Sequence, residues 1–484
     1  MNTWSSILPP ALTLVAVLVT RRVIISLAAG VLAGSWLLAG GLVAGLEKAG
    51  EFILSSLTEA NNAVIILFLF LFGSLTEMMS LSGGIKGFTG LMDRYVRGNR
   101  AAQLSVWYLT PLTFIDCCFH AIATGTVAKP ILEREGGSKT RLAMTVTITS
   151  SQLVALVPVA TTYVGYVVAL VAGALQQIGS SASSFGLYLH SLPFNFFSIL
   201  MVLTALGLLW PGFGPKKEKA TGEKIGGKHP HVVPEKGVHE KEEAEHQRSE
   251  PVLRPNPLNL IVPLGFLLAA TALFLARTGS GKGPGLMSIL LNADFERSIF
   301  LAALLTVAVA GLFYLAQGIG PGNLEKALLH GGMELLPPIV ILVLAWSLSR
   351  VTEGLGFSKL VAAGTAGGLP AALLPVLVFL LGAGVSYVIG SSWATWGLLM
   401  PAALSLGKAV AIGGGLGEAL LVGAVLAGGS VGDCASPLGE TPMLSASLME
   451  LNLAGHIRSI LPYAIGAVSL AATLYLVFGC VWLR

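Results

Sequence analysis

Runs of about 20 apolar residues recur along this chain from end to end, and a run of that length is what an α-helix needs to cross the hydrocarbon core of a bilayer. Hydrophobic residues make up 54% of the 484 residues and charged residues only 11%, whereas soluble domains carry about 25% charged residues. One stretch, 216–254, holds nine basic and eight acidic residues, so the rest has too few polar side chains to cover a globular surface. The sequence therefore predicts a polytopic membrane protein and excludes a soluble enzyme, a nucleic-acid binder and a disordered hub.

We expect about ten membrane-spanning helices in an all-α fold. Two further apolar stretches, 101–128 and 369–406, do not read as single spans. The expected spans are 6–20, 23–45, 61–82, 142–176, 187–211, 257–277, 297–317, 331–352, 418–447 and 459–482.

Basic residues identify the stretch 101–128 as a re-entrant hairpin. Clusters of Lys and Arg lie on both sides of it, at 86–100 and at 129–141, and such clusters mark cytoplasmic loops. If both clusters are cytoplasmic, the stretch between them enters and leaves the membrane on one side. Each arm then has about 13 residues, which is too short for a full span. The stretch 369–406 is expected to be the corresponding hairpin, entering from the outside.

Weak internal similarity, with an offset of roughly 270–280 residues, predicts two repeats. Each repeat would have five crossings and one hairpin, so the second copy enters the bilayer upside down, as in secondary transporters. We expect repeats at 1–212 and 257–484, joined by a charged cytoplasmic linker at 213–256. The matching pairs are Leu46–Ala49 with Leu324–Ala327, Ser74–Leu75 with Ser347–Leu348, Ala123–Thr124 with Ala394–Thr395, and Leu192–Pro193 with Leu461–Pro462.

The linker mixes charge, Gly and Pro, which is typical of a solvated connector. It contains four of the eight histidines, so a metal or regulatory site is the alternative interpretation. These histidines are His229, His231, His239 and His246.

The first hairpin carries polar residues at an unusual depth. An ionisable side chain within a membrane is costly unless it serves an ion, a proton or a partner, so Asp116 is a candidate ion site. The alternative is a structural hydrogen bond that holds the hairpin tip. His120 reads more readily as a neutral interior side chain than as a ligand, and Thr124 adds a hydroxyl.

The second hairpin offers a flexible glycine followed by hydroxyls. Gly390 permits an unwound backbone, and Ser391, Ser392 and Thr395 supply oxygens. Half-helix N-termini at such breaks attract carboxylates, while unwound carbonyls coordinate sodium. Small residues for close helix packing are the alternative reading.

The segment 428–442 places four glycines and two prolines inside a long apolar run, which predicts a broken helix. Two acids and several hydroxyls surround the break, a combination that packing does not require. The corresponding stretch of the first repeat, 150–162, is polar without an acid and includes Gln152. The candidates at the break are Asp433, Ser436, Glu440 and Thr441, and Asp116 and Asp433 are the Na+ candidates.

Several of these motifs resemble those of NhaC-type Na+/H+ antiporters. They are Gly432–Pro437 with Glu440–Thr441, the run from His456 to Ala464, Phe114–Asp116 with Gly125 and Lys129–Ile131, and Gly390–Trp393. The resemblance implies an ion transporter with paired, opposed hairpins. Two acids of the family pattern are missing, because Cys117 and Thr147 stand at those positions.

The resemblance implies a secondary active transporter of the cell membrane rather than an enzyme. Na+/H+ antiport by alternating access is the leading expectation, and coupled transport or exchange of a small carboxylate or amino acid is the alternative. We expect no cofactor, Na+ and/or H+ as coupling ion, a lipid bilayer and a small solute as partners, and no nucleic acid; a homodimer is compatible with the sequence. The cysteines beside Asp116 and Asp433 read as packing residues rather than transition-metal ligands, and Glu77 is a further polar candidate.

Overall fold

A computed structural model describes residues 3–92, 101–114, 116–135, 137–158, 161–210, 213–215, 254–280, 292–356, 370–410 and 415–483, together with residues 285, 289 and 412. Nearly all of the predicted linker, including its four histidines, lies outside these residues.

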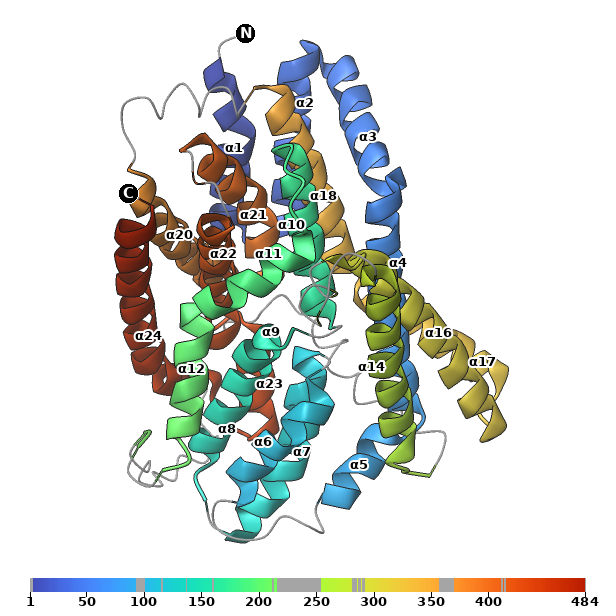
Figure 1. The fold of residues 1–484 in the computed structure, drawn as a ribbon. Coiled ribbons are helices and arrows are strands. Elements are labelled where there is room, and N and C mark those ends of the chain that lie inside the picture. The colour runs from blue at the N-terminus through green and yellow to red at the C-terminus, as the bar shows by residue number, and fades with distance from the viewer. Residues whose placement is uncertain are drawn as a thin grey trace.

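All regular elements of the described residues are helical, as predicted (Figure 1). The first half of the chain comprises α1 (Leu8–Thr20), α2 (Val23–Ala39), α3 (Leu42–Thr58), α4 (Ala60–Leu81), α5 (Gly84–Met92), α6 (Ala101–Thr113), α7 (Cys117–Glu135), α8 (Lys139–Ile148), α9 (Val154–Leu156), α10 (Thr162–Gln177), α11 (Ser184–Ser191) and α12 (Phe196–Gly207). The second comprises α14 (Leu258–Gly279), α16 (Phe295–Ala316), α17 (Pro321–Glu334), α18 (Leu336–Gly354), α20 (Leu374–Ile389), α21 (Ser392–Ala409), α22 (Leu416–Ala435), α23 (Glu440–Leu448) and α24 (Leu453–Trp482).

Length and hydropathy confirm a multi-pass membrane protein. Among the described residues, seven helical segments are long and apolar enough to cross a bilayer, and the pair Ser184–Phe194 and Phe196–Gly207, bent by 51°, would make an eighth. Two shorter apolar helices, Ser5–Thr20 and Val23–Ala39, precede them.

Four predicted spans are wrong in their bounds or continuity. The run 23–45 ends at Ala39, because Gly40 adopts a left-handed conformation with φ of 72°, and a separate amphipathic helix, α3, follows it. The run 331–352 begins only at Leu336, where prolines occupy the first turn. The runs 142–176 and 187–211 are interrupted near Pro158 and bent at Asn195, respectively.

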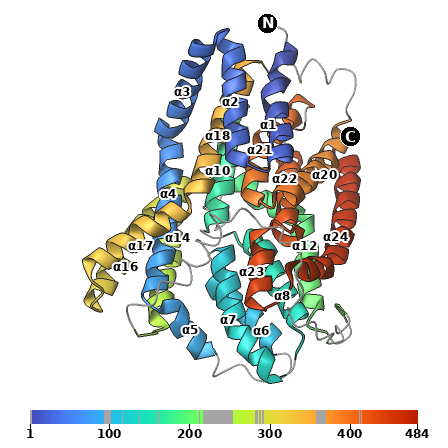
Figure 2. The ribbon, with the colours of Figure 1, turned by 180° about the vertical axis from the view of Figure 1, so that it is seen from behind.

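The two re-entrant hairpins approach the middle of the molecule from opposite ends. In Figures 1 and 2, α6 and α7 lie at the lower end of the protein, while α20 and α21 lie in its upper part. The first hairpin turns between the end of α6 and Asp116, and the second at Gly390 and Ser391. Although Ala371–Ile389 is apolar enough for a span, α20 packs against α21, which follows directly after this turn.

Helices of one half pack against helices of the other half, and each such pair has a counterpart in which the two halves exchange roles. Helix α2 packs on α18 while α16 packs on α4, and α10 packs on α21 while α23 packs on α7. The matched serines behave alike, since Ser74 donates to the carbonyl of Leu328 at 2.7 Å and Ser347 to that of Phe52 at 3.4 Å. Such reciprocity is what a two-fold relation between repeats produces. The division of the chain at 213–256 stays a prediction.

Helix α22 lies at the centre of the protein and is surrounded by α11, α12, α20, α21 and α24. Its glycines allow this crowding. A Cβ at Gly432 would lie 2.1 Å from the carbonyl oxygen of Ser386, and one at Gly428 would lie 2.6 Å from that of Phe379. Small residues therefore bring α20 against α22.

An exposed ion-pair cluster joins the first hairpin to the loop between α23 and α24. Glu450 accepts from Lys129 at 2.7 Å and from Lys139 at 3.0 Å. These two ammonium groups, Lys129 first, lower the pKa of Glu450 from 4.5 to about 2. Because the pKa is lower in the folded protein, the pairing contributes stability above the unfolded value and loses it as the pH falls through the folded value.

We therefore expect Glu450→Gln to lower the thermal unfolding temperature slightly at about pH 7, and the difference from wild type to narrow at about pH 3. Thermal unfolding of the full chain in detergent measures this. Glu51→Gln is the matched control, because its exposed pair with Lys48 lies within one helix. A difference that does not change with pH would contradict the assignment to Glu450 ionisation.

Candidate functional site

Three helix interruptions meet at the junction between the two halves. They are the turn of the first hairpin at Asp116, the turn of the second at Gly390, and the break between α22 and α23 at 436–439. The thiol of Cys118 lies 2.9 Å from the carboxylate of Glu440, which joins the first hairpin to the break. The three polar stretches found in the sequence are thus neighbours in space.

Asp433 lies in the last turn of α22 and is 6% exposed. Its Oδ2 accepts from the hydroxyl of Ser392 and from that of Tyr163 at 3.4 Å, and its Oδ1 accepts from the backbone N–H of Ser392 at 3.4 Å. Ser392 is the first residue of α21, where backbone N–H groups have no partner within the helix. The N-terminus of α21 therefore holds a carboxylate of the protein itself, in the place where we had expected one from a substrate.

Two further carboxylates lie at helix N-termini. Asp116 precedes α7, and its Oδ1 accepts from the N–H groups of Cys118 at 2.9 Å and Phe119 at 3.1 Å. Glu440 is the first residue of α23. Each of the three acids thus meets the positive end of a helix dipole, which favours negative charge.

The same three carboxylates form one cluster. All of them lie near enough to the sulfur of Cys117 to act on it electrostatically. The sequence left open whether Asp116 and Asp433 share a site, and the structure brings them into one polar region around Cys117.

Four predicted hydroxyls stabilise the broken backbone. Thr441 donates to the carbonyl of Asp433, and Ser436 donates to that of Tyr387 at 2.7 Å. The hydroxyl of Ser391 caps α21, and Thr395 donates to the carbonyl of Ser391 at 2.9 Å. These side chains fix the shape of the site around Asp433.

The remaining predicted residues belong to a neighbouring buried network. His120 is fully buried between the hydroxyls of Thr113, 2.7 Å from Nδ1, and Thr149, 3.0 Å from Nε2. Thr124 donates to the carbonyl of His120 at 2.6 Å. The environment of His120 fits the neutral, satisfied histidine that we preferred from sequence.

Gln152 bridges the two halves within the same region. Its amide donates to the carbonyl of Ser430 on α22 at 2.9 Å, and its oxygen accepts from Ser198 at 2.7 Å. Gln152 therefore fixes the interrupted helix of the first half against the helix that carries Asp433.

Tyr163 was missed by the sequence analysis and belongs to an aromatic cluster beside Asp433. Its ring stacks on Trp393 at 4.8 Å and meets Trp396 edge-on at 5.4 Å. Tyr166 donates to the carbonyl of Trp393 at 2.8 Å. The available signal was the position of both tyrosines directly after the polar break at 150–162, in the half of the chain opposite to Asp433.

Within the part of the chain that the structure describes, two groups of side chains have potential metal ligand atoms within 4.8 Å of one another. One is Asp116 with Cys117 and Cys118, inside the site, and the other is the more exposed set of Glu77, His330 and Glu334. The first group provides two thiols and a carboxylate. The second group shows that Glu77 lies beside His330 and Glu334, apart from the Asp433 site.

Opposed hairpins and broken helices around a buried carboxylate define a secondary membrane transporter. Comparison with known proteins gives the particular family. The model of the Na+/H+ antiporter family matches residues 153–480, and the chain belongs to that family.

Curated relatives of this chain include antiporters. A protein of Haemophilus influenzae without an assigned function is 26% identical over 99% of this chain and 91% of its own length. The arginine/ornithine antiporter ArcD of Halobacterium salinarum is 43% identical over 115 residues, which cover 23% of this chain and 22% of ArcD. The Na+/H+ antiporter NhaC of Alkalihalophilus pseudofirmus is 26% identical over 40% of this chain and 42% of its own. NhaC is thus one of its homologues, as the motifs indicated.

A solved structure supports the fold. MtrF of Neisseria gonorrhoeae superposes with a TM-score of 0.53 at 17% identity, covering 93% of this chain and 85% of MtrF. At this identity the likeness concerns the fold alone.

Gly390 provides a structural test of the site. Its φ is 78°, and a Cβ there would lie 2.5 Å from the carbonyl of Leu438 in the break. We expect Gly390→Ala to lower the free energy of unfolding by about 2 kcal/mol or more, since it combines a left-handed conformation with a clash. Thermal or denaturant unfolding in detergent measures the loss.

Gly384→Ala is the matched control, because Gly384 lies in α20 with open space around its Cβ position. We expect it to be neutral or to stabilise the protein by about 0.5–1 kcal/mol. Equal effects of the two substitutions would contradict the close contact between the second hairpin and the break.

Proposed function

We propose that this protein exchanges Na+ for H+ by alternating access, as an NhaC-type antiporter. The observation that carries the proposal is the carboxylate of Asp433, buried at the junction of the two halves and held by Ser392 and Tyr163. An ionised carboxylate this deep in a membrane protein costs free energy, so such a group is either protonated or serves to bind an ion or a partner.

Competition for one carboxylate couples the two ions. Na+ needs an ionised oxygen ligand, whereas a proton neutralises the same group, so binding of one excludes the other. With a single exchangeable site, the protein crosses between its two states loaded with either ion. Movement of one ion down its gradient then drives the other.

Ser392 suits this exchange because its hydroxyl has two acceptors. It contacts the carboxylate of Asp433 and, at 3.1 Å, the carbonyl of Gly429. A hydroxyl rotates to suit its partners. When Na+ binds, the Ser392 hydrogen turns to Gly429 and its oxygen faces the cation; without Na+ it stabilises Asp433.

Tyr163 lies on α10 in the first half of the chain, whereas Ser392 and Asp433 lie in the second half. A rocking movement of one half against the other would separate Tyr163 from Asp433 and change access to the carboxylate. The protein would act in the plasma membrane, with the linker 213–256 in the cytoplasm.

Exchange of a small carboxylate or an amino acid is the second candidate. The match to an arginine/ornithine antiporter at 43% identity over 115 residues favours it. Under this reading, Asp433 binds the coupling cation and the organic solute binds elsewhere in the protein.

The test of the first proposal is Asp433→Asn in proteoliposomes. We expect Na+-driven change of internal pH to fall by about tenfold or more, because the amide neither ionises nor takes up a proton. A pH-sensitive dye inside the vesicles measures the rate, without any organic solute present. Asp433→Glu should retain part of the activity.

Glu51→Gln serves as control, since Glu51 is exposed on α3 and pairs only with Lys48 among the described residues. Full exchange by Asp433→Asn would refute the role of Asp433. A wild-type rate that depends strictly on an internal amino acid or organic acid would replace the first candidate with the second.

A further inference from the structure

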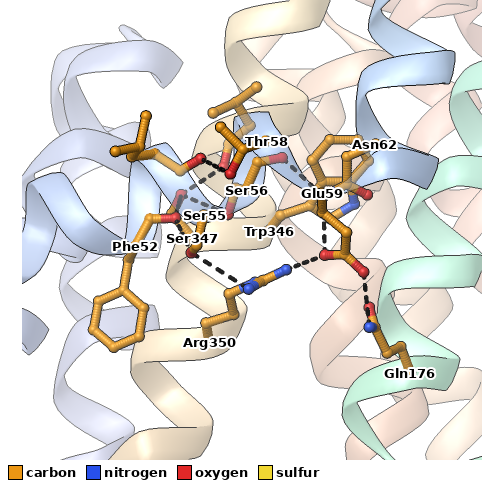
Figure 3. A network of polar contacts seen from close by, with 12 residues as sticks. Phe52, Ser55, Ser56, Thr58, Glu59, Asn62, Gln176, Trp346, Ser347 and Arg350 are labelled. Carbon is orange, nitrogen blue, oxygen red and sulfur yellow. Dashed lines mark hydrogen bonds and ion pairs between the residues drawn. The ribbon is translucent and has the colours of Figure 1, made fainter.

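Charged side chains also meet in a cavity of about 630 Å³ away from Asp433, among the junction of α3 and α4 and the C-terminal ends of α10 and α18. Figure 3 shows Arg350 pairing with the Oε2 of Glu59, whose Oε1 accepts from Gln176 at 2.8 Å. The guanidinium also donates to the hydroxyl of Ser55 at 3.3 Å. Arg350 and Glu59 thus neutralise each other, and their network joins helices of the two halves.

A cluster with different chemistry lies at the tip of the first hairpin. Cys117 and Cys118 are the first two residues of α7, and neither forms a disulfide. Their sulfur atoms lie 3.7 Å apart, and the thiol of Cys118 donates to the Oε1 of Glu440 at 2.9 Å. A carboxylate oxygen of Asp116 lies within 4.8 Å of both sulfurs. Two sulfurs and two carboxylates, from opposite halves of the chain, therefore converge on one place.

The distances between these atoms are close to those around a tetrahedral metal ion. With zinc–sulfur bonds of about 2.3 Å, two sulfurs that bind the same Zn2+ lie about 3.8 Å apart. Cys117 and Cys118 already have nearly this separation. A sulfur and a carboxylate oxygen on one Zn2+ lie about 3.5 Å apart, so the contact between Cys118 and Glu440 would lengthen only slightly. The cluster is thus preorganised for a tetrahedral ion.

The backbone of α7 fixes the carboxylate of Asp116 beside the two sulfurs. Its Oδ1 accepts from the N–H groups of Cys118 at 2.9 Å and Phe119 at 3.1 Å. Carboxylates that bind metal ions are commonly hydrogen-bonded to other groups as well, and each oxygen accepts more than one partner. The hydrogen bonds of Asp116 therefore orient the group without excluding a metal ion.

We propose that the tip of the first hairpin binds a thiophilic divalent cation of the Zn2+ class. Its ligands are the sulfurs of Cys117 and Cys118 and the carboxylates of Asp116 and Glu440. On binding, each thiol releases its hydrogen to solution as a proton, and the ion takes the place of these hydrogens between the ligand atoms. Nothing is oxidised or reduced in this step. The site adds a metal ion to the protein and does not depend on Na+/H+ exchange at Asp433.

The two sulfurs determine which cations the site prefers. Thiolates favour soft and borderline ions such as Zn2+ and Cd2+, whereas Mg2+ and Ca2+ prefer oxygen ligands. Glu440 is exposed and Cys117 is buried, so an ion enters past the carboxylate and reaches the sulfurs last. The cluster therefore has both an entrance and a binding place.

A bound ion would hold the first hairpin to the start of α23. Cys118 belongs to the first half of the chain and Glu440 to the second, and α7 packs against α23. Any step of the transport cycle that separates these two elements then requires the ion to leave first. We therefore expect the ion to slow transport. This effect, unlike the binding itself, rests on the proposed function.

Titration of the purified full-length protein with Cd2+ tests the site, with the ultraviolet absorption of the cadmium–thiolate bond as the readout. Because only sulfur ligands give this band, binding to the histidines of the linker does not contribute to it. We expect the band to saturate at about one Cd2+ per chain. An excess of Zn2+ should then remove the band, and the same excess of Mg2+ should not.

Cys118→Ser should weaken Cd2+ binding by about a hundredfold or more, because a neutral hydroxyl replaces a thiolate ligand. Glu440→Gln should weaken it by about tenfold while the band persists, since both sulfurs remain. Cys480→Ser is the matched control, because Cys480 lies near the end of α24 and is not part of the cluster. Thermal unfolding of each variant without metal separates a lost ligand from a lost fold.

Absence of the band in wild type at millimolar Cd2+ would overturn the proposal, as would an unchanged band in Cys118→Ser. A band that Mg2+ removes as readily as Zn2+ would also overturn it. Because the titration uses no ion gradients, each of these results leaves the Asp433 proposal standing. Conversely, a failure of Na+/H+ exchange does not alter the cadmium band.

The effect on transport is measured in proteoliposomes, with each variant compared with its own rate without metal. Zn2+ should slow wild type and Cys480→Ser alike, and leave Cys118→Ser close to its metal-free rate. Equal slowing of Cys118→Ser would show that Zn2+ acts elsewhere and would overturn this part of the inference. A wild-type rate that Zn2+ does not change, at a concentration that removes the cadmium band, would overturn it as well.

Discussion

The structure around the site depends on the pairing of carboxylates with the ends of broken helices. Helices α7, α21 and α23 begin at the junction of the two halves, and their first N–H groups have no partner within the helix. Asp116, Asp433 and Glu440 lie at these ends and bring negative charge to the positive poles of the dipoles. The breaks and the acids thus stabilise each other. At Asp433, the buried member of the three, removing either would leave buried polar groups without partners.

This arrangement bears on the exchange that we propose at Asp433. Among the described residues, Asp433 is held by hydrogen bonds from Ser392 and Tyr163, and no Lys or Arg pairs with it. A Lys or Arg partner would fix its charge, whereas hydroxyls adapt to either state. The ion pair of Arg350 and Glu59 lies instead in the separate cavity at the junction of α3 and α4. The carboxylate of Asp433, with its hydroxyl partners, and the ion pair of Arg350 and Glu59 thus lie at two separate places in the protein.

The sequence predicted the fold well wherever hydropathy and local breakers decide it. Spans, both hairpins and the break after Gly432 follow from apolar runs interrupted by glycine, proline and charge. Helix α3 was missed because Glu47, Lys48 and Glu51 on its polar face lower its mean hydropathy below that of a membrane span. The same reading began the next span at 331, in the last turn of α17, because the apolar run was not divided at the prolines that open α18.

The sequence by itself determined that this is a polytopic helical membrane protein with three polar interruptions, because composition and helix-breaking residues are local properties. Only the tertiary structure decided which groups meet. Tyr163 reaches Asp433 from 270 residues away, and Arg350 meets Glu59 across 291 residues. Such pairs depend on how helices pack, and the free energy of packing is shared among many apolar contacts that no single motif records.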